Sequence, residues 1–192
     1  MNRTEVINSY LDKVYSPKSY LEIGVRNLSN NFNAIRADIK DGVDPDPNSK
    51  CNYVMTSDEF FKLVDAKYDV VFVDGLHLQD QAYRDIVNSL KSLKKNGVLV
   101  IHDCNPPTKY HQRDHGKREW NGTVWKAFVQ LRCERKDLEM FVVDADWGLG
   151  IIRPNRNQKL FKCSENIYDY DVFSKHRKEA LNLISVEEFK AK

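Results

Sequence analysis

The sequence predicts an α/β fold in which helices cover both faces of one mostly parallel sheet. Short apolar runs alternate with segments of helical periodicity, which is typical of parallel strands joined by crossover helices. The run VVFVD (70–74) is almost entirely β-branched or aromatic, as expected of a strand that is buried on both faces. Two neighbouring apolar runs, 140–144 and 147–153, predict a closing hairpin that makes the last strand antiparallel.

The first half of the chain supplies the early elements of this fold. An apolar stripe from Val6 to Val14 predicts a first helix, and YLEIGV (20–25) predicts a buried strand. Thr56 and Glu59 fit a capping box that opens a helix through about Val64. The elements expected between this strand and this helix are a short helix around 29–37, a strand ending at 42–44 and a short strand at 52–55.

The second half continues the alternation. After the strand at 70–74, apolar residues at helical spacing predict a helix over 79–95, which Asn96 and Gly97 end. Residues 104–119 are polar, contain two prolines and predict a long loop. The remaining expected elements are a strand at 98–103, a helix around 124–131, the hairpin and a terminal helix around 172–184.

Length and composition favour one domain, 1–192, of ordinary globular composition. The chain has 192 residues, of which 41% are hydrophobic and 30% charged. The formal net charge of +2 gives no electrostatic reason to expect nucleic acid or a membrane surface as a partner. No apolar run is long enough to span a bilayer, and the first residues lack the apolar core of a signal peptide. The four cysteines form no CxxC pair, so we expect reduced thiols and a cytoplasmic protein.

Polar residues gather where the predicted strands end, and ligands of such sheets bind at this edge. Asp74 ends one strand and His102–Asp103 ends the next. We expect these side chains to converge, because neighbouring strands lie about 4.8 Å apart. His77 follows three residues after Asp74 and is a candidate general base, since imidazole titrates near neutral pH; the alternative is a histidine hydrogen-bonded within a loop. The full set at this edge comprises Glu22, Asp44, Ser57, Asp58, Asp74, His77, His102 and Asp103.

Other histidines and aromatic residues have simpler interpretations. His111 and His115 have HxxxH spacing, but their surroundings do not look helical, so we expect a polar loop rather than a metal site. Trp120 and Trp125 are expected to be packing anchors, with Trp120 as the one that could face a substrate, and Trp147 is expected to be structural. Within the loop at 104–119, the candidate acceptor-binding residues are Tyr110, Arg113, His115, Lys117 and Arg118.

Four motifs follow one another along the chain, each at a strand end: EIGV (22–25), GVDPDP (42–47), DVVFVDGLH (69–77) and GVLVIHDCNPP (97–107). Together they resemble the class I S-adenosylmethionine-dependent methyltransferases, and most of all a small bacterial branch associated with sugar or natural-product tailoring. The resemblance covers a core of about 18–153 and leaves 154–192 as a C-terminal helical extension. It implies a three-layer, Rossmann-like methyltransferase fold with seven strands in the order 3-2-1-4-5-7-6, strand 7 being antiparallel.

The resemblance implies S-adenosylmethionine as the cofactor. The turn at Gly24 would pass along the methionine part, Glu22 would accept hydrogen bonds nearby, and Asp74 would line the pocket. Asp44 would accept both ribose hydroxyls, as a carboxylate does in nucleotide-binding βαβ units. The corner Ser57–Asp58 would contact adenine. The alternative for Glu22 is a solvated side chain, and for Asp44 it is a turn aspartate. For Ser57 and Asp58 the alternative is helix capping.

Some methyltransferases of this kind hold a divalent ion at the positions of Asp74, His102 and Asp103. The ion would bind two substrate oxygens and lower the pKa of a hydroxyl. Mg²⁺ prefers oxygen ligands, whereas a histidine ligand favours Mn, Fe or Zn or leaves His102 outside the coordination sphere. The alternative is a site without metal, in which Asp74 lines the pocket and Asp103 caps a turn.

The chain departs from the family pattern after Gly24, where VRNLSNN (25–31) lacks a second glycine. Three classes of function stay open. The favoured one is an O-methyltransferase acting on a small hydroxylated acceptor, such as a sugar or polysaccharide precursor, with His77 as the first candidate base and His102 as the second. The others are a catalytically degenerate methyltransferase fold that serves as a binding or scaffold module, and a nicotinamide-dependent enzyme, which the absence of GxGxxG disfavours. A homo-oligomer is also left open.

Overall fold

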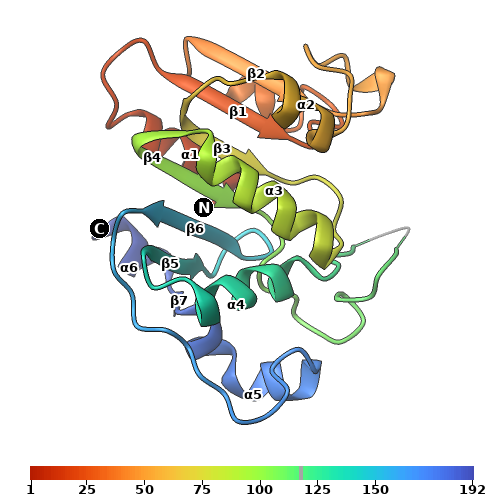
Figure 1. Cartoon of the computed structure of the whole chain (residues 1–192), viewed down its shortest axis with the longest axis vertical. Helices are drawn as coiled ribbons and strands as arrows, with labels where there is room; N and C mark the ends of the chain where they lie inside the picture. The colour runs from red at the N-terminus through yellow and green to blue at the C-terminus, as the bar shows by residue number, and fades with distance from the viewer. Residues whose placement is uncertain (117–118) are drawn as a thin grey trace.

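One seven-stranded sheet organises the computed structural model, which describes residues 1–116 and 119–192 (Figure 1). The strands are β1 (Ser19–Ile23), β2 (Ile39–Val43), β3 (Tyr68–Val73), β4 (Leu93–Ile101), β5 (Leu138–Val143), β6 (Leu149–Pro154) and β7 (Leu183–Ile184). Their order across the sheet is β2-β1-β3-β4-β6-β5-β7. β6 is antiparallel to β4 and β5, and the other pairs are parallel, which confirms the predicted fold class.

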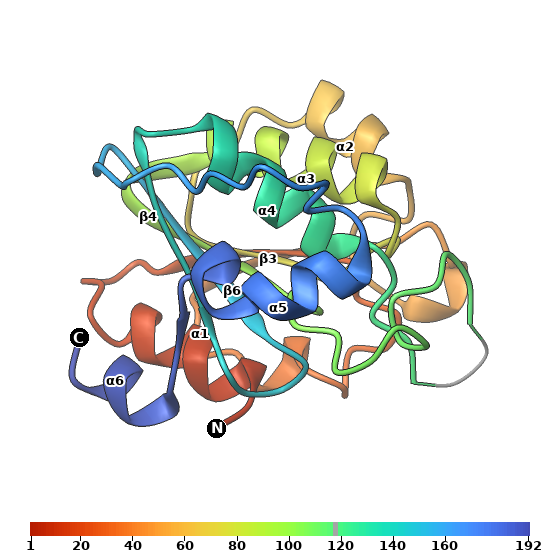
Figure 2. The same cartoon turned by 90° about the horizontal axis from the view of Figure 1, so that it is seen from below.

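Helices cover both faces of the sheet, so the fold has three layers (Figure 2). One face carries α1 (Arg3–Leu11) and α6 (Val186–Lys190). The opposite face carries α2 (Ser57–Leu63), α3 (Gln79–Lys91) and α4 (Val124–Glu134), with α5 (Tyr170–Leu181) packed against α4. No described helix has both the length and the apolar character that crossing a membrane requires.

The apolar run of β3 is buried on both faces, as its composition predicts. Val71 and Val73 belong to the core under α2 to α5, whereas Val70 and Phe72 belong to the core under α1. Side chains of a strand point alternately to its two faces, so a strand between two helical layers has to be apolar throughout. This burial fixes the position of Asp74, the next residue, at the edge where the strand ends.

The predicted third strand was wrong. Residues 52–55 form only an isolated bridge between Tyr53 and Val43. The Asn52 side chain accepts a hydrogen bond from the Gly42 amide (2.6 Å) and donates one to the Lys40 carbonyl (3.2 Å), so it occupies groups on β2 that a further strand would use. The seventh strand is instead β7, a short stretch inside the expected terminal helix, at the far edge of the sheet beside β5.

Two predicted helices are shorter than expected. Instead of a helix over 29–37, there is a single 3₁₀ turn, Phe32–Ala34, because the Asn27 side chain accepts from the backbone of Ser29 and competes with helical hydrogen bonding. The helix predicted over 79–95 ends at Lys91, and the next residues join β4. There Lys94 Nζ lies 2.7 Å from the Asp69 carboxylate, an ion pair that supports the strand rather than the helix.

Both ends of α1 are defined by specific contacts. The Asn2 side chain accepts from the Glu5 amide, and the Glu5 carboxylate accepts from the Asn2 amide, so a capping box starts the helix at Arg3, earlier than the apolar stripe predicts. Near the other end, the rings of Tyr10 and Phe189 meet edge to face at 5.9 Å. This contact packs α6 against α1 on the same face of the sheet.

Candidate active site

A cavity of about 1100 Å³ opens at the carboxyl ends of β1 to β4. Parallel strands direct their C-terminal loops to this edge, so residues far apart in the sequence meet there. All the residues predicted to bind the cofactor, act in catalysis or hold a metal line it: Glu22, Gly24, Asp44, Ser57, Asp58, Asp74, His77, His102 and Asp103. Their individual roles are treated as proposals below.

The loop after β1 turns sharply against the loop after β3. Gly24 has a φ of +87°, and a Cβ atom there would lie 2.2 Å from the carbonyl oxygen of Asp74. Arg26 also adopts a left-handed conformation (φ 51°), and its amide donates to Asp44 Oδ2 at 2.7 Å. A non-glycine residue therefore makes the second left-handed turn of this loop, for which the family pattern supplies a glycine.

Glu22 is buried in β1 at the inner end of the cavity. Its Oε2 atom accepts from the hydroxyl of Tyr20 (2.6 Å) and from the side-chain amide of Asn31 (2.9 Å). Burial disfavours the charged form and raises the pKa of Glu22 to about 7, although both hydrogen bonds oppose that rise. The carboxyl group thus changes charge near neutral pH.

Substituting Glu22 by glutamine is expected to stabilise the protein at pH 8. Because the pKa of Glu22 rises from 4.5 to about 7 on folding, its contribution to stability is present below the unfolded pKa and is lost as the pH rises through 7. Glutamine keeps an acceptor for Tyr20 and Asn31 without the charge. Denaturant unfolding should show a gain on the order of 2–3 kcal/mol at pH 8 and much less at pH 5.

The exposed Glu179, on α5, provides the matched control, because Glu179→Gln removes a carboxylate that lies in solvent. Its unfolding free energy should follow that of the wild type at both pH values. Equal stabilities of Glu22→Gln and the wild type at pH 8 would show that Glu22 does not carry a buried charge there.

Asp44 follows β2 and is almost fully buried. Its two oxygens accept from the backbone amides of Arg26 (2.7 Å) and Asp46 (2.8 Å), and these contacts fix the carboxylate at the cavity wall. Asp46, the other acidic residue of the motif, instead caps the turn Pro47–Ser49. Of these two carboxylates, only that of Asp44 lines the cavity.

Another wall of the cavity is formed by the start of α2 together with α3. Thr56 caps α2, as predicted, which leaves the side chains of Ser57 and Asp58 available to the cavity. The Ser57 hydroxyl donates to Asp85 Oδ1 at 2.6 Å, and the Gln81 amide donates to the same atom at 2.9 Å. Burial raises the pKa of the Asp85 carboxyl. This end of the cavity therefore carries a connected set of polar groups.

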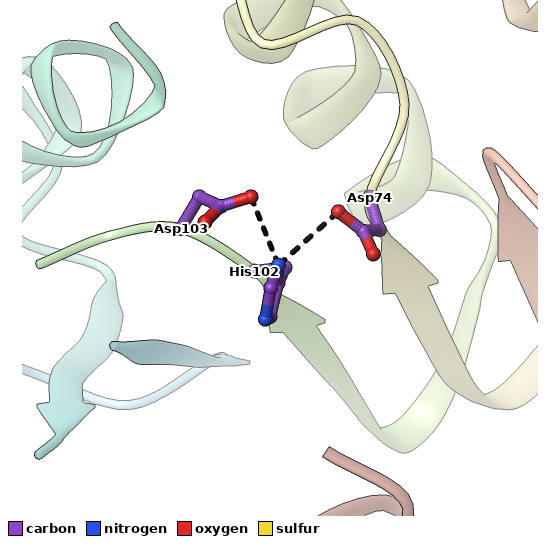
Figure 3. Close-up of side chains that lie close together, drawn as sticks. All are labelled: Asp74, His102 and Asp103. Atoms are coloured by element: carbon purple, nitrogen blue, oxygen red, sulfur yellow. Dashed lines mark hydrogen bonds and ion pairs between the residues drawn. The ribbon is translucent and has the colours of Figure 1, made fainter. Parts of the chain in front are cut away.

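Asp74, His102 and Asp103 converge at the ends of β3 and β4, as the sequence predicts (Figure 3). His102 Nδ1 lies 2.9 Å from Asp103 Oδ2 and 3.2 Å from Asp74 Oδ1, and its Nε2 lies 3.3 Å from Asp146 Oδ1. Burial lowers the pKa of His102, but the surrounding carboxylates outweigh it and raise the pKa well above its usual value. With a carboxylate beside each ring nitrogen, His102 is poorly placed to accept a proton from a substrate.

His77 lies on the loop between β3 and α3, beside this cluster. Its Nδ1 is 3.0 Å from the carbonyl oxygen of Trp120, which only accepts, so Nδ1 carries a proton. Its Nε2 lies 3.4 Å from both Asp74 Oδ1 and Asp103 Oδ2. Burial lowers the pKa of His77, whereas Asp74 and Asp103 raise it more, and the net shift is upward. Nε2 is the nitrogen that can exchange a proton with a bound molecule.

Arg3 and Asp146 complete the cluster, and the sequence analysis did not find either of them. Arg3 Nη1 lies 2.7 Å from Asp74 Oδ2, and Arg3 Nε lies 3.0 Å from Asp146 Oδ2. The partners are 71 and 143 residues away from Arg3, so sequence spacing carried no sign of the pairing. The Asn2–Glu5 capping box could have placed Arg3 in the first turn of a helix, although not at the site.

One of the three tryptophans lies in the core, and the other two line the cavity. Trp125 is fully buried in the core and stacks on Phe173, which confirms it as a packing anchor. Trp120 and Trp147 belong to neither core cluster, and both line the cavity. Trp120 therefore lies at the cavity, as the alternative for it allowed, and so does Trp147, because the loop and hairpin that carry them end at the open edge of the sheet.

The long loop contributes less to the cavity than predicted. Gly116 and Glu119 line it, whereas Tyr110, Arg113 and His115 do not. Arg113 instead stacks on the ring of Tyr110, with 3.8 Å between the guanidinium carbon and the ring centre. The other two expected acceptor-binding residues, Lys117 and Arg118, lie outside the described residues.

The donor set of the cluster fits a divalent ion. Ligand atoms at neighbouring positions around an ion with bonds of about 2.1 Å lie about 3 Å apart. The two distances from His102 Nδ1, 2.9 and 3.2 Å, match this spacing, and one atom each from Asp74, His102 and Asp103 can be chosen within 4.8 Å of one another. Arg3 contacts the other oxygen of Asp74, so Oδ1 is the atom directed at the shared position.

Comparison with known proteins agrees with this fold. Residues 18–104 match the model of a family described as a methyltransferase domain. No curated protein sequence matches the chain significantly. The order of the sheet and this match agree with the resemblance to the class I S-adenosylmethionine-dependent methyltransferases that the four motifs carry.

Solved structures show the same fold at low sequence identity. A Podospora anserina methyltransferase solved with S-adenosylhomocysteine has a TM-score of 0.57 and 17% identity, over 81% of this chain and 77% of that one. An O-methyltransferase of tomaymycin synthesis from Streptomyces achromogenes, solved with S-adenosylmethionine, has a TM-score of 0.51 and 14% identity, over 73% and 74%. A methyltransferase of the mycinamycin pathway, solved with Mg, S-adenosylhomocysteine and mycinamycin VI, has a TM-score of 0.51 and 14% identity, over 84% of this chain but 50% of that one.

Proposed function

We propose that the protein transfers a methyl group from S-adenosylmethionine to a hydroxyl of a small acceptor. The observation that carries the proposal is one continuous cavity. Its walls run from the polar groups of Glu22, Asp44 and Ser57 to the cluster around Asp74 and His77. A cofactor site and a proton acceptor therefore share one space. The solved structures with S-adenosylmethionine or S-adenosylhomocysteine support the choice of cofactor.

The residues present fit the proposed cofactor. Asp44 has two oxygens that each hold only one backbone amide, so lone pairs stay free to accept both ribose hydroxyls. Ser57 and Asp58 would face the adenine, beside the polar groups of Asp85. Glu22, Gly24 and Asp74 would enclose the methionine part. The Gly24 turn can approach Asp74 closely there because glycine has no Cβ.

The protein's own groups would align the acceptor and take its proton. When bound, S-adenosylmethionine supplies the methyl group for in-line transfer to the acceptor oxygen. His77 Nε2 is the proposed base: Trp120 holds the ring through Nδ1, and the carboxylates of Asp74 and Asp103 stabilise the positive charge that the ring gains. His102, predicted as the second candidate base, is assigned instead to the proposed metal site with Asp74 and Asp103.

A divalent ion, Mg or Mn, is part of this proposal. Asp74, His102 and Asp103 would hold it, and the mycinamycin-pathway structure, which contains Mg, supports this assignment. The ion would lower the pKa of an acceptor hydroxyl, which adds to the action of the base.

The free thiols of Cys51, Cys104, Cys133 and Cys163 support the proposed cytoplasmic location, where thiols stay reduced.

Thermal unfolding with different ligands tests the function directly. A ligand that binds only the folded state raises the melting temperature, so S-adenosylhomocysteine should raise it and NAD should not. MnCl₂ should raise it in the wild type and not in Asp103→Asn. If none of these ligands shifts the melting temperature, the chain is a degenerate fold rather than an enzyme; a shift with NAD alone would indicate a nicotinamide-dependent enzyme.

Asp44→Ala is expected to weaken S-adenosylhomocysteine binding by about tenfold or more. The change removes the charged partner of two buried ribose hydroxyls, which costs on the order of 1.5–3 kcal/mol. Calorimetric titration measures the change. Asp46→Ala is the matched control, because Asp46 caps a turn outside the cavity, and its affinity should equal that of the wild type. Equal affinities for both variants would move the ribose contact elsewhere.

A further inference from the structure

We propose that Trp120 and Trp147 form the walls of an acceptor slot that selects molecules with a hydroxylated ring. The proposal rests on the proposed function and names the class of acceptor for the same site. A ring face that carries C–H groups or π electrons packs well against indole, whereas an open-chain polyol presents no such face. The predicted sugar or polysaccharide precursor is one member of this class, and a phenol is another.

Both indoles line the cavity instead of filling the core. Trp120 and Trp147 are absent from the two hydrophobic clusters that bury most of the large aromatic side chains. Trp147 keeps 37% of its surface exposed. Exposed aromatic surface that gathers at a cavity is typical of ligand-binding sites.

Each tryptophan also contacts, or directly follows in the chain, a residue of the charged cluster. Trp120 stacks on the ring of His77, with 4.8 Å between the ring centres and 27° between the planes, and its carbonyl accepts from His77 Nδ1. Trp147 follows Asp146, which contacts His102. Both indoles are therefore carried by segments that also position groups of the proposed reaction centre.

The backbone is strained where it presents Trp147. Asp146, Trp147 and Gly148 have φ values of 46°, 65° and 88°, three left-handed residues in succession. The first two carry side chains, and such residues rarely adopt this conformation. A Cβ on Gly148 would lie 2.4 Å from the Asn105 amide nitrogen, so the turn is pressed against the loop after β4. Strain of this kind persists where it sets the position of functional groups.

The cavity has room for an acceptor beside the cofactor. Its volume of about 1100 Å³ exceeds the range of about 300–1,000 Å³ that is common for sites of one small ligand. Gly116 allows the close approach of Trp120, because a Cβ there would lie 2.9 Å from Trp120 Cβ and Cγ. We assign to the acceptor the part of the cavity that the two indoles line.

Labelling the protein with 5-fluorotryptophan provides a direct readout, because the chain has three tryptophans. Single Trp→Phe variants assign the three ¹⁹F resonances, and Trp125, which is buried in the core, serves as the internal control. The S-adenosylhomocysteine complex is titrated with phenol, with methyl β-D-glucopyranoside and with glycerol. We expect at least one of the two ring compounds to shift the resonances of Trp120 and Trp147, and glycerol to shift neither. Which ring compound acts distinguishes a phenolic acceptor from a sugar.

Variants then test the energetic role of each wall. Trp147→Ala should weaken binding of the active ring compound by roughly three- to tenfold, and Trp147→Phe should retain most of it. Tyr15→Ala, which removes a ring that is 96% exposed and lies outside the cavity, is the control and should leave binding unchanged. In all three variants the calorimetric affinity for S-adenosylhomocysteine should equal that of the wild type.

Several results would overturn the slot. These are equal shifts with glycerol and with the ring compounds, shifts with none of the three probes, a shift confined to Trp125, or ring binding that survives Trp147→Ala unchanged. Each of these can occur while S-adenosylhomocysteine still binds, so the slot can fail while the proposed function stands. Loss of S-adenosylhomocysteine binding in the wild type would instead contradict the proposed function, and the slot with it.

Discussion

Gly24→Ala is expected to unfold at a temperature on the order of 10 °C below the wild type and to lose measurable affinity for S-adenosylhomocysteine. The new Cβ would lie 2.2 Å from the Asp74 carbonyl oxygen and 2.6 Å from Gly75 Cα, both of them backbone atoms that cannot move aside cheaply. The φ of +87° adds strain for any residue with a side chain. Together these effects cost roughly 2–5 kcal/mol. Thermal unfolding and calorimetry measure both changes.

Gly75→Ala is the matched control, since Gly75 lies in the loop that Gly24 contacts. A Cβ on Gly75 would meet its nearest neighbours, Asp85 Oδ2 and Ile23 Cγ2, at 3.5 Å, which is ordinary van der Waals contact. Its melting temperature should stay within about 3 °C of the wild type. A Gly24→Ala protein with wild-type stability and affinity would mean that the two loops do not approach each other as closely as described.

Arg3→Met is expected to lower the free energy of unfolding by about 2–3 kcal/mol. Arg3 is the guanidinium between Asp74 and Asp146, and its removal leaves two partly buried carboxylates without their closest positive partner. The exposed part of the Arg3 side chain, 27%, reduces the cost below that of a fully buried pair. Methionine keeps most of the apolar stem, so the change tests the charge more than the packing. Denaturant unfolding at pH 7 gives the difference.

Arg36→Met supplies the comparison, because Arg36 pairs with Asp12 at 2.6 Å on the open surface. Ion pairs of that kind contribute about 0–1 kcal/mol, so this variant should differ little from the wild type. If the two variants were equally stable, the Arg3 contacts would contribute no more to stability than a surface pair.

Much of the sheet and of its ligand edge could be predicted because both depend on local patterns. The β-branched run ending at Asp74 identifies a buried strand, and the hairpin identifies the antiparallel β6. Once those strands are in order, the polar residues that follow them have to share an edge. The convergence of Asp74, His102 and Asp103 was predicted in this way, without any knowledge of side-chain positions.

The rest depended on contacts that sequence spacing does not encode. Asn52 occupies β2 through its side chain, and no local pattern separates such a residue from one that starts a strand. Arg3 joins the cluster from the other end of the domain, and Trp147 faces the cavity because three residues in succession turn left-handed. Apolar or charged character alone would assign these side chains to the core or to the solvent.

The Arg3–Asp146 contact has a consequence for how the protein folds. It joins residues 143 positions apart, and the Tyr10–Phe189 contact at the other end of α1 closes an even longer loop. Contacts of such separation form slowly, because the entropy of closing the loop opposes them until the intervening strands are in place. The β1 to β4 half of the sheet can therefore assemble before the charged cluster is complete. In refolding, the ability to bind ligand should appear in the final kinetic phase, after most of the secondary structure has formed.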